Sequence, residues 1–237
     1  MEKYGIIGAM ESEVRQLCDE LTDTEIVEYA GLRFFTGILK GKAVVIVKSG
    51  IGKVNAALCA QALILKFNVT KIINTGIAGA FAKGLGVFDF VVSTAALYHD
   101  FDTTAFGYKT GQVPGMPESF TADEQLLDAA ITAFGETEFS KEHKIVKGLV
   151  ASGDQFISDS SAKKRIQENF EPACVEMEGC AIAHTCYLNK IPFVIVRCMS
   201  DMADESVEQT YAFNEDVCAA ACACFVKKVI EIAGEAV

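Results

Sequence analysis

Short apolar runs alternate with segments of helical periodicity along most of this 237-residue chain. Several runs, among them AVVIV at 43–47 and PFVIV at 192–196, are apolar throughout, as is typical of strands covered by helices on both faces. The pattern predicts strands over Lys3–Gly8, Arg33–Leu39, Ala43–Lys48, Lys71–Thr75, Phe88–Thr94, Ile145–Ser152, Ala173–Met177 and Phe193–Ser200.

Helical patterns follow most of these strands. They are predicted over Glu11–Leu21, Val54–Phe67, Ala122–Phe134, Ser161–Asn169, Glu178–Asn189 and Tyr211–Ile232. This alternation predicts an α/β fold, a single domain over residues 1–237 with a central twisted mixed β-sheet flanked by about six α-helices. The sheet is expected to be mixed because Phe34–Leu39 and Val44–Val47, joined by Lys40–Lys42, read as an antiparallel pair.

One long segment, His99–Phe120, has several aromatic residues and little periodicity. An irregular span of this length inside a compact domain is usually functional. The sequence therefore predicts one domain that carries one functional loop.

Charge and cysteine content narrow the possible partners. The chain has 21 Lys+Arg against 32 Asp+Glu, a net charge of −11, which argues against nucleic acid because phosphate contacts require basic side chains. No apolar stretch reaches the ~18–20 residues of a membrane helix, and the N-terminus has no signal-peptide pattern. Nine cysteines in apolar surroundings indicate reduced thiols, so we expect a cytoplasmic protein without nucleic-acid or membrane partners.

Candidate chemistry gathers where the predicted strands end. Ligands of open α/β sheets bind beyond the carboxyl ends of the strands, and the segments that follow those ends are polar or rich in glycine. They bring three carboxylates and a single arginine to one rim: Glu13, Glu178, Asp201 and Arg197.

Each of these features also has a structural interpretation. Glu13 falls in a first helical turn, where an acid stabilises the helix dipole. Asp201 fits a helix N-cap. Gly50-Ile51-Gly52 lacks the third glycine of a dinucleotide loop, because that position is Asn55. Arg197 and Asp201, however, end an otherwise apolar strand, where burial without a purpose would be costly, so for this pair the functional interpretation is favoured.

Histidine and cysteine suggest no further site. The three histidines lack the spacing of metal ligands, so no metal site is predicted. His99 and His184 are interpreted as hydrogen-bonding residues of the core or rim. Cys218, Cys222 and Cys224, in the Ala-rich segment DVCAAACACF, are interpreted as small core residues.

Long motifs carry a resemblance to a known family. GIIGAMESEV, VKSGIGKVNAA, INTGIAGA, YHDFDTTAFGYKTGQVPG, SGDQFI, VEMEGCAIAH and RCMSDMAD occur in this order between Lys3 and about Phe213. The chain thereby resembles the bacterial 5′-methylthioadenosine/S-adenosylhomocysteine nucleosidases of the nucleoside phosphorylase/nucleosidase superfamily. The resemblance implies a nucleoside phosphorylase-like fold, a homodimer, no cofactor, and hydrolysis of the N-glycosidic bond of these nucleosides, and of 5′-deoxyadenosine, with release of adenine.

The resemblance also implies residue roles. Glu13 would activate water that Arg197 helps to place, Glu178 would hold the ribose hydroxyls, and Asp201 would protonate adenine N7. Phe106 and Pro114 would reach the thioalkyl pocket of the neighbouring subunit. The remaining residues implied to bind the purine nucleoside are Ile51, Ala78, Gly79, Phe156, Ile157, Met177, Ser200 and Tyr211.

The implied chemistry requires these residue types. Cleavage of the C1′–N9 bond needs an acid at the leaving purine and a base for water, as two carboxyl groups provide in glycosidases. The sequence departs from the family at GIAGA, where GSAGG is common, so Ile77 removes a hydroxyl, and Tyr211 adds one at the pocket mouth.

Three alternatives remain. A purine nucleoside phosphorylase would need cationic donors for phosphate, yet Glu13 would repel it, and the remaining arginines, Arg15, Arg33 and Arg165, fall outside the rim segments. An aminofutalosine nucleosidase would share the three acids, so that only the 5′ pocket distinguishes it. A non-catalytic nucleoside-binding protein is disfavoured because all three acids are present.

Overall fold

The computed structural model describes residues 2–203 and 207–233, with the side chains of 207–213 outside the description. Its strands are β1 (Lys3–Gly8), β2 (Thr22–Tyr29), β3 (Leu32–Leu39), β4 (Lys42–Lys48), β5 (Lys71–Ala80), β6 (Phe90–Tyr98), β7 (Phe120–Thr121), β8 (Ile145–Ser152), β9 (Cys174–Glu176) and β10 (Phe193–Asp201). Its α-helices are α1 (Glu11–Asp19), α2 (Lys53–Phe67), α3 (Glu124–Gly135), α4 (Ser160–Phe170), α5 (Gly179–Asn189) and α6 (Val207–Ile232).

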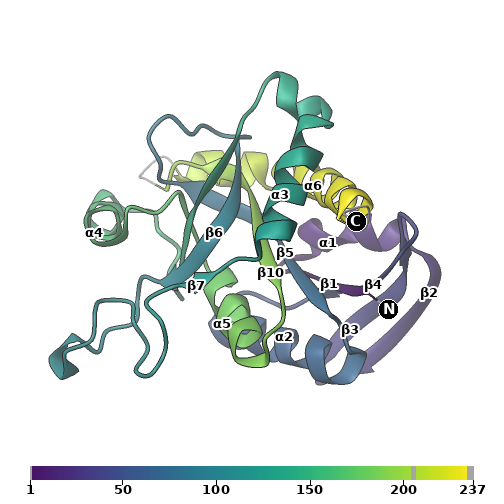
Figure 1. Ribbon diagram of the computed structural model, residues 1–237. Helices are drawn as coiled ribbons and strands as arrows, with labels where there is room; N and C mark the ends of the chain where they lie inside the picture. The colour runs from purple at the N-terminus through teal and green to yellow at the C-terminus, as the bar shows by residue number, and fades with distance from the viewer. Residues whose placement is uncertain (1, 204–206, 234–237) are drawn as a thin grey trace.

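The strands form one mixed sheet that closes on itself along part of its width (Figure 1). From its outer edge the order is β2-β3-β4-β1-β5, and β5 pairs with both β9 and β10. β10 pairs with β6, β6 with β8 and β8 with β9, so five strands complete a ring. The predicted mixed α/β sheet is confirmed, and the ring brings strands from distant parts of the chain to one end.

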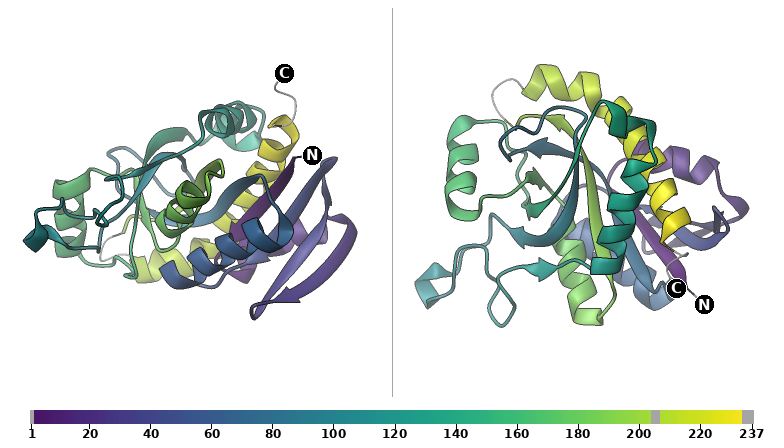
Figure 2. Two further views of the ribbon diagram at one scale, coloured as in Figure 1. Left: turned by 60° about the horizontal axis from the view of Figure 1, so that its bottom comes forward. Right: turned by 45° about the horizontal axis from the view of Figure 1, so that its top comes forward.

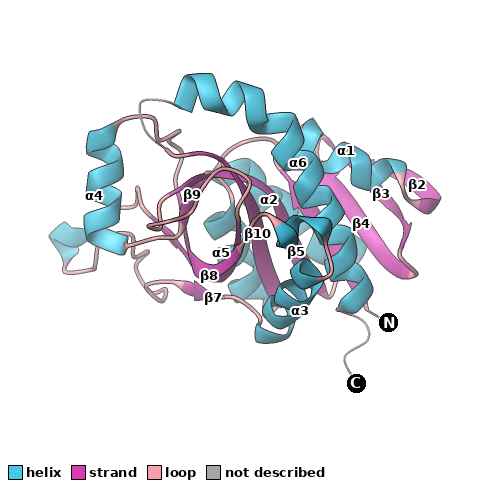
Figure 3. Cartoon of the chain, turned by 90° about the horizontal axis from the view of Figure 1, so that it is seen from above, coloured by secondary structure: helices cyan, strands magenta, loops and turns pink. Residues whose placement is uncertain are grey.

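Helices cover both faces of the sheet, with α1, α3 and α6 on one side and α2 and α5 on the other (Figures 1 and 3). Two buried apolar clusters fill the two interfaces. Cys218 and Cys222 are fully buried in the cluster beneath α6, as predicted, whereas Cys224 on the same helix is only half-buried. None of the helices within the described ranges is long and apolar enough to cross a membrane.

The strand predicted over Lys71–Thr75 is longer in the structure. β5 continues to Ala80, and Gly76 pairs in parallel register with Arg197 of β10. Gly76 allows the Glu13 carboxylate to approach the backbone of β5, because a Cβ at this position would lie 2.4 Å from Glu13 Oε1. The strand stays in the sheet while a side chain from α1 packs directly on its backbone.

The irregular segment between β6 and β7 contains one short 3₁₀ helix, Thr104–Phe106. It reaches away from the body of the molecule, at the lower left of Figure 1 and again in both views of Figure 2. Phe106 is 80% exposed at its end.

Candidate active site

A pocket opens where β1, β5, β9 and β10 end, the rim at which the sequence predicted the site. It is lined by most of the predicted residues: Glu13, Ile51, Ala78, Gly79, Phe156, Ile157, Met177, Glu178, Ser200 and Asp201. Segments from six different parts of the chain therefore meet at one place.

Glu13 is buried at the start of α1, with its carboxylate held by backbone amides. Oε2 accepts hydrogen bonds from the amides of Ala9 at 2.6 Å and Met10 at 3.0 Å, and Oε1 accepts from that of Ile77 at 3.1 Å. Burial raises the pKa of Glu13, while the charge of Arg197 and these amides offset part of the rise. Glu13 thus caps its helix and also faces the pocket.

Glu178 stands at the N-cap position of α5. Its Oε1 accepts a hydrogen bond from the Gly52 amide at 2.9 Å, which ties the loop before α2 to the start of α5. Burial, followed by the negative charge of Glu176, raises the pKa of Glu178 to about 8. A carboxylate that is costly to ionise is suited to binding a developing positive charge.

Asp201 ends β10 inside the pocket wall. The Ser200 hydroxyl donates to Oδ2 at 2.7 Å, and the Ala203 amide donates to Oδ1 at 2.7 Å. Asn214 of α6 fixes the same turn by donating to the Ser200 carbonyl at 3.0 Å. A Cβ on Gly79 would lie 3.0 Å from Asp201 Oδ1, so the missing side chain leaves room for this carboxylate.

Arg197 does not line the pocket. It is 2% exposed and lies behind Glu13, where its Nη2 contacts Glu176 and donates to Asn74 Oδ1 at 2.6 Å. Burial opposes its charged form, but the carboxylates of Glu176, Glu13 and Glu178 raise the pKa of Arg197 overall. The guanidinium is therefore a buried counter-charge beneath the acids.

Besides Arg197, two predicted residues are not brought to the pocket. Phe106 and Pro114 lie in the projecting segment between β6 and β7, outside the pocket of their own chain. Tyr211 belongs to α6, and its side chain lies outside the described residues.

The sequence reasoning missed Glu176 and Asn74. Glu176 borders the pocket and contacts Arg197, and Asn74 lies beneath it in β5. The spacing in Glu176-Met177-Glu178 carried the signal: two acids separated by one residue, directly after a buried strand.

Comparisons with known proteins agree with this geometry. A family model described as the phosphorylase superfamily matches residues 3–231. A 5′-methylthioadenosine/S-adenosylhomocysteine nucleosidase of Bacillus cereus is 44% identical over 230 residues, 97% of this chain and 98% of the relative.

Solved structures are similar over almost the whole fold. The Colwellia psychrerythraea 5′-methylthioadenosine/S-adenosylhomocysteine nucleosidase in complex with adenine has a TM-score of 0.93 at 42% identity, covering 98% of this chain and 96% of that one. A futalosine hydrolase mutant of Helicobacter pylori has a TM-score of 0.92 at 29% identity, with coverages of 98% and 99%.

Fold, pocket and relatives thus define a protein of the nucleoside-cleaving α/β class. The chain belongs to the phosphorylase superfamily and, within it, to the 5′-methylthioadenosine/S-adenosylhomocysteine nucleosidases, which makes it an N-glycosidic hydrolase.

Proposed function

We propose that this enzyme hydrolyses the N-glycosidic bond of 5′-methylthioadenosine and S-adenosylhomocysteine, and also that of 5′-deoxyadenosine, releasing adenine. The observation that carries the proposal is the meeting of three buried carboxyl groups, Glu13, Glu178 and Asp201, in one pocket. The names of the relatives support the substrate class.

Asp201 is proposed as the acid at the purine. Cleavage of the C1′–N9 bond leaves its electron pair on adenine, and a proton delivered to N7 neutralises that charge. Ser200 supports the role because its hydroxyl orients one carboxyl oxygen at 2.7 Å. Phe156 and Ile157, on the adjacent wall, are proposed to hold the base.

Glu13 and Glu178 are proposed to act on the sugar. Glu13 would take a proton from the attacking water. The positive charge of Arg197, which lies behind Glu13, would favour the ionised form of Glu13. Glu178 and Met177 would hold the ribose hydroxyls, and the negative charge of Glu178 would stabilise the oxocarbenium-like sugar more than the substrate. Ile51, Ala78 and Gly79 complete this wall.

Water is favoured over phosphate as the nucleophile. The described residues that line the pocket include no lysine, arginine or histidine, and Arg197 is occupied by Glu176. A phosphate dianion beside Glu13 would meet like charge without a cationic donor.

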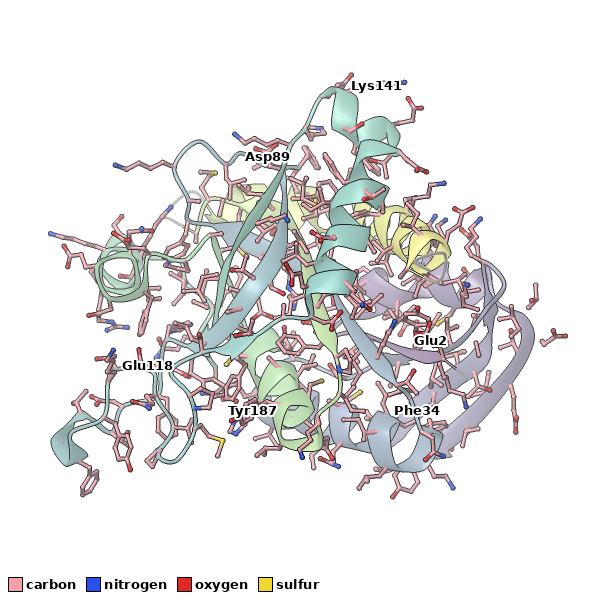
Figure 4. The ribbon with its side chains drawn as sticks, viewed as in Figure 1. Glu2, Phe34, Asp89, Glu118, Lys141 and Tyr187 are labelled. Carbon is pink, nitrogen blue, oxygen red and sulfur yellow. The ribbon has the colours of Figure 1, made fainter. Side chains whose placement is uncertain are left out.

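A homodimer is proposed to complete the pocket. α2 exposes Val54, Leu58 and Leu65 along one face, and the neighbouring α5 exposes Tyr187, labelled in Figure 4, and Leu188. A second copy that covers this apolar surface would bring its own Phe106 and Pro114 to the thioalkyl end, beside Tyr211. All nine cysteines are free thiols, which fits the cytoplasm we propose as its compartment.

The futalosine hydrolase neighbour keeps aminofutalosine as a second candidate substrate. Both substrate classes require the same three acids and differ at the 5′ end. The test is release of the purine base, with and without phosphate: adenine from methylthioadenosine, S-adenosylhomocysteine, 5′-deoxyadenosine and aminofutalosine, and hypoxanthine from inosine. We expect release from the first three in phosphate-free buffer. Strict dependence on phosphate, or cleavage of aminofutalosine alone, would overturn the proposal.

A further inference from the structure

Glu176 is the buried carboxylate of the pocket that none of these roles uses. It is 7% exposed, ends β9 and borders the pocket two residues before Glu178. Its oxygens accept hydrogen bonds from three elements: from the Ser152 hydroxyl of β8, from Arg197 Nη2 of β10, and from the amides of Glu178 and Gly179 at the start of α5. A carboxylate that accepts hydrogen bonds from this many donors is held in one orientation at the edge of the pocket.

Through Arg197, Glu176 acts on Glu13. Within the described part of the chain, the ion pair of Arg197 is made with Glu176. A Cβ on Gly76 would lie 2.4 Å from Glu13 Oε1 and 3.2 Å from Arg197 Nη1, so the two groups flank one glycine. The guanidinium is near enough to attract Glu13, yet its own partner is the carboxylate on its other side.

Through the backbone, Glu176 acts on Glu178. Its Oε2 accepts from the Glu178 amide at 3.1 Å and the Gly179 amide at 2.7 Å. A helix leaves its first amides without partners inside the helix, so these bonds fix the direction in which α5 begins. The Glu178 carboxylate then meets the Gly52 amide.

Ser152 completes the support. Its hydroxyl donates to Glu176 Oε1 and accepts from the Cys180 amide at 2.7 Å. The first turn of α5 is thus held on two sides, by Glu176 and by β8. Both contacts are buried, where hydrogen bonds are electrostatically stronger and more costly to break than at the surface.

We propose that Glu176 is a positioning residue for hydrolysis, which holds Arg197 off Glu13 and fixes the start of α5, so that Glu13 and Glu178 both face the sugar. This inference rests on the proposed function, because that reaction requires the two carboxylates. Without a charge at position 176, the buried guanidinium would turn to Glu13, since an unpaired buried charge is strongly unfavourable. Glu13 would then be tied into an ion pair and lose strength as a base.

Removal of the charge at position 176 should also change the pH dependence of the activity. Glu176 is the second cause, after burial, of the raised pKa of Glu178, so its removal lowers that pKa and moves the acid limb of the activity profile to lower pH. A role in packing alone would leave the limb in place. The titratable or charged groups whose charges interact with Glu176 are Arg197, Glu178, Cys174, Cys180 and His99.

The test is Glu176→Gln, which keeps the size and an acceptor oxygen but removes the charge. We expect kcat for adenine release to fall on the order of 10²-fold, with KM within about threefold and the acid limb lower by about half a pH unit. Glu176→Asp, which keeps the charge, should leave the limb where it is. Glu11→Gln is the matched control, because Glu11 is exposed on α1 and pairs with Lys48 at 3.0 Å.

A double-mutant cycle locates the effect. If Glu176 acts on Glu13 through Arg197, Glu176→Gln combined with Arg197→Met should be no slower than Arg197→Met alone. Additive losses would overturn this link. Turnover of Glu176→Gln within threefold of the wild type, with an unmoved acid limb, would overturn the whole inference. Should that variant not fold, an acid limb of Glu176→Asp that moves to lower pH although the charge is retained would overturn it.

The proposed function can fail separately. A wild-type protein that releases adenine from none of the nucleosides would contradict the proposed function. The role of Glu176 would then be tested by a binding measurement. Calorimetric binding of adenine across pH by the wild type and Glu176→Gln then decides the role: coincident profiles would contradict it, and a profile displaced to lower pH would support it.

Discussion

The Ser200 hydroxyl donates to Asp201 Oδ2 across 2.7 Å, and both residues are buried at the end of β10. One carboxyl oxygen is therefore held by a side chain, and the other is held by the amide of Ala203. The arrangement fixes the plane of the carboxyl group at the side of the pocket proposed to hold the purine. A proton donor in a fixed orientation is what the departing base requires.

Asp201→Asn should abolish most turnover without unfolding the protein. The amide has the same size but cannot protonate adenine, so we expect adenine release to fall roughly 10²–10⁴-fold while the melting temperature changes little. Stopped assays of adenine by chromatography measure it. Asp128→Asn, at an exposed ion pair with Lys147 at 3.1 Å, is the control. Near wild-type turnover of Asp201→Asn would remove Asp201 from the proposed role.

Gly76→Ala should damage catalysis by displacing Glu13. Its methyl group would lie 2.4 Å from Glu13 Oε1, so the carboxylate has to leave its three amide donors. We expect kcat to fall on the order of 10²-fold. Gly135→Ala in α3 is the matched control, because a Cβ there meets nothing within 4 Å. Equal activity of the two variants would show that Glu13 tolerates the shift.

Glu178→Gln should make the folded protein more stable at alkaline pH while it inactivates the enzyme. The pKa of Glu178 is raised from 4.5 to about 8 on folding, so its contribution to stability is complete below 4.5 and is lost as pH rises through 8. The neutral amide avoids this loss. Melting temperatures of the variant and the wild type should agree at pH 4 and diverge by pH 9, by roughly 2–4 °C for each kcal/mol.

A control variant and a contradicting outcome complete the test of the pH-dependent stability of Glu178→Gln. Glu138→Gln, at a surface position whose side chain is 86% exposed, should show no such divergence. If Glu178→Gln melts below the wild type at both pH values, the side chain stabilises the fold as a charged hydrogen-bond acceptor, and its pKa is not raised.

Leu58→Glu should separate the proposed dimer. Leu58 is exposed in the middle of the apolar face of α2, and a charge there would have to be buried in the interface. Sedimentation should show monomers, and adenine release from methylthioadenosine should fall because Phe106 and Pro114 no longer reach the partner's pocket. Gln16→Glu on α1, on the opposite side of the sheet, is the control. A fully active Leu58→Glu monomer would contradict the shared pocket.

Much of the fold followed from apolar periodicity, but β2 did not. Thr22–Tyr29 reads TDTEIVEY, and almost every side chain in it is exposed. An edge strand that buries neither face has no alternation to detect, and its identity comes from hydrogen bonding to β3. The local sequence therefore carries no record of the pairing.

The residues of the candidate site could likewise be predicted only in part from the sequence. Glu13, Glu178 and Asp201 could be found because each follows a strand end and lies in a long motif. Glu176 could not be separated from Glu178 by position, because only the fold turns one toward Arg197 and the other toward Gly52.

The depth of the Arg197–Glu176 pair has a consequence for the solvents in which the enzyme can work. Mobile ions screen charges that water reaches, over about 10 Å at 0.1 M salt, and they do not enter a packed interior. The surface pair of Lys48 and Glu11 should weaken as salt is added, whereas the side chains of Arg197 and Glu176 are only 2% and 3% exposed. The electric field beneath the proposed sugar site should therefore stay constant across wide changes of ionic strength.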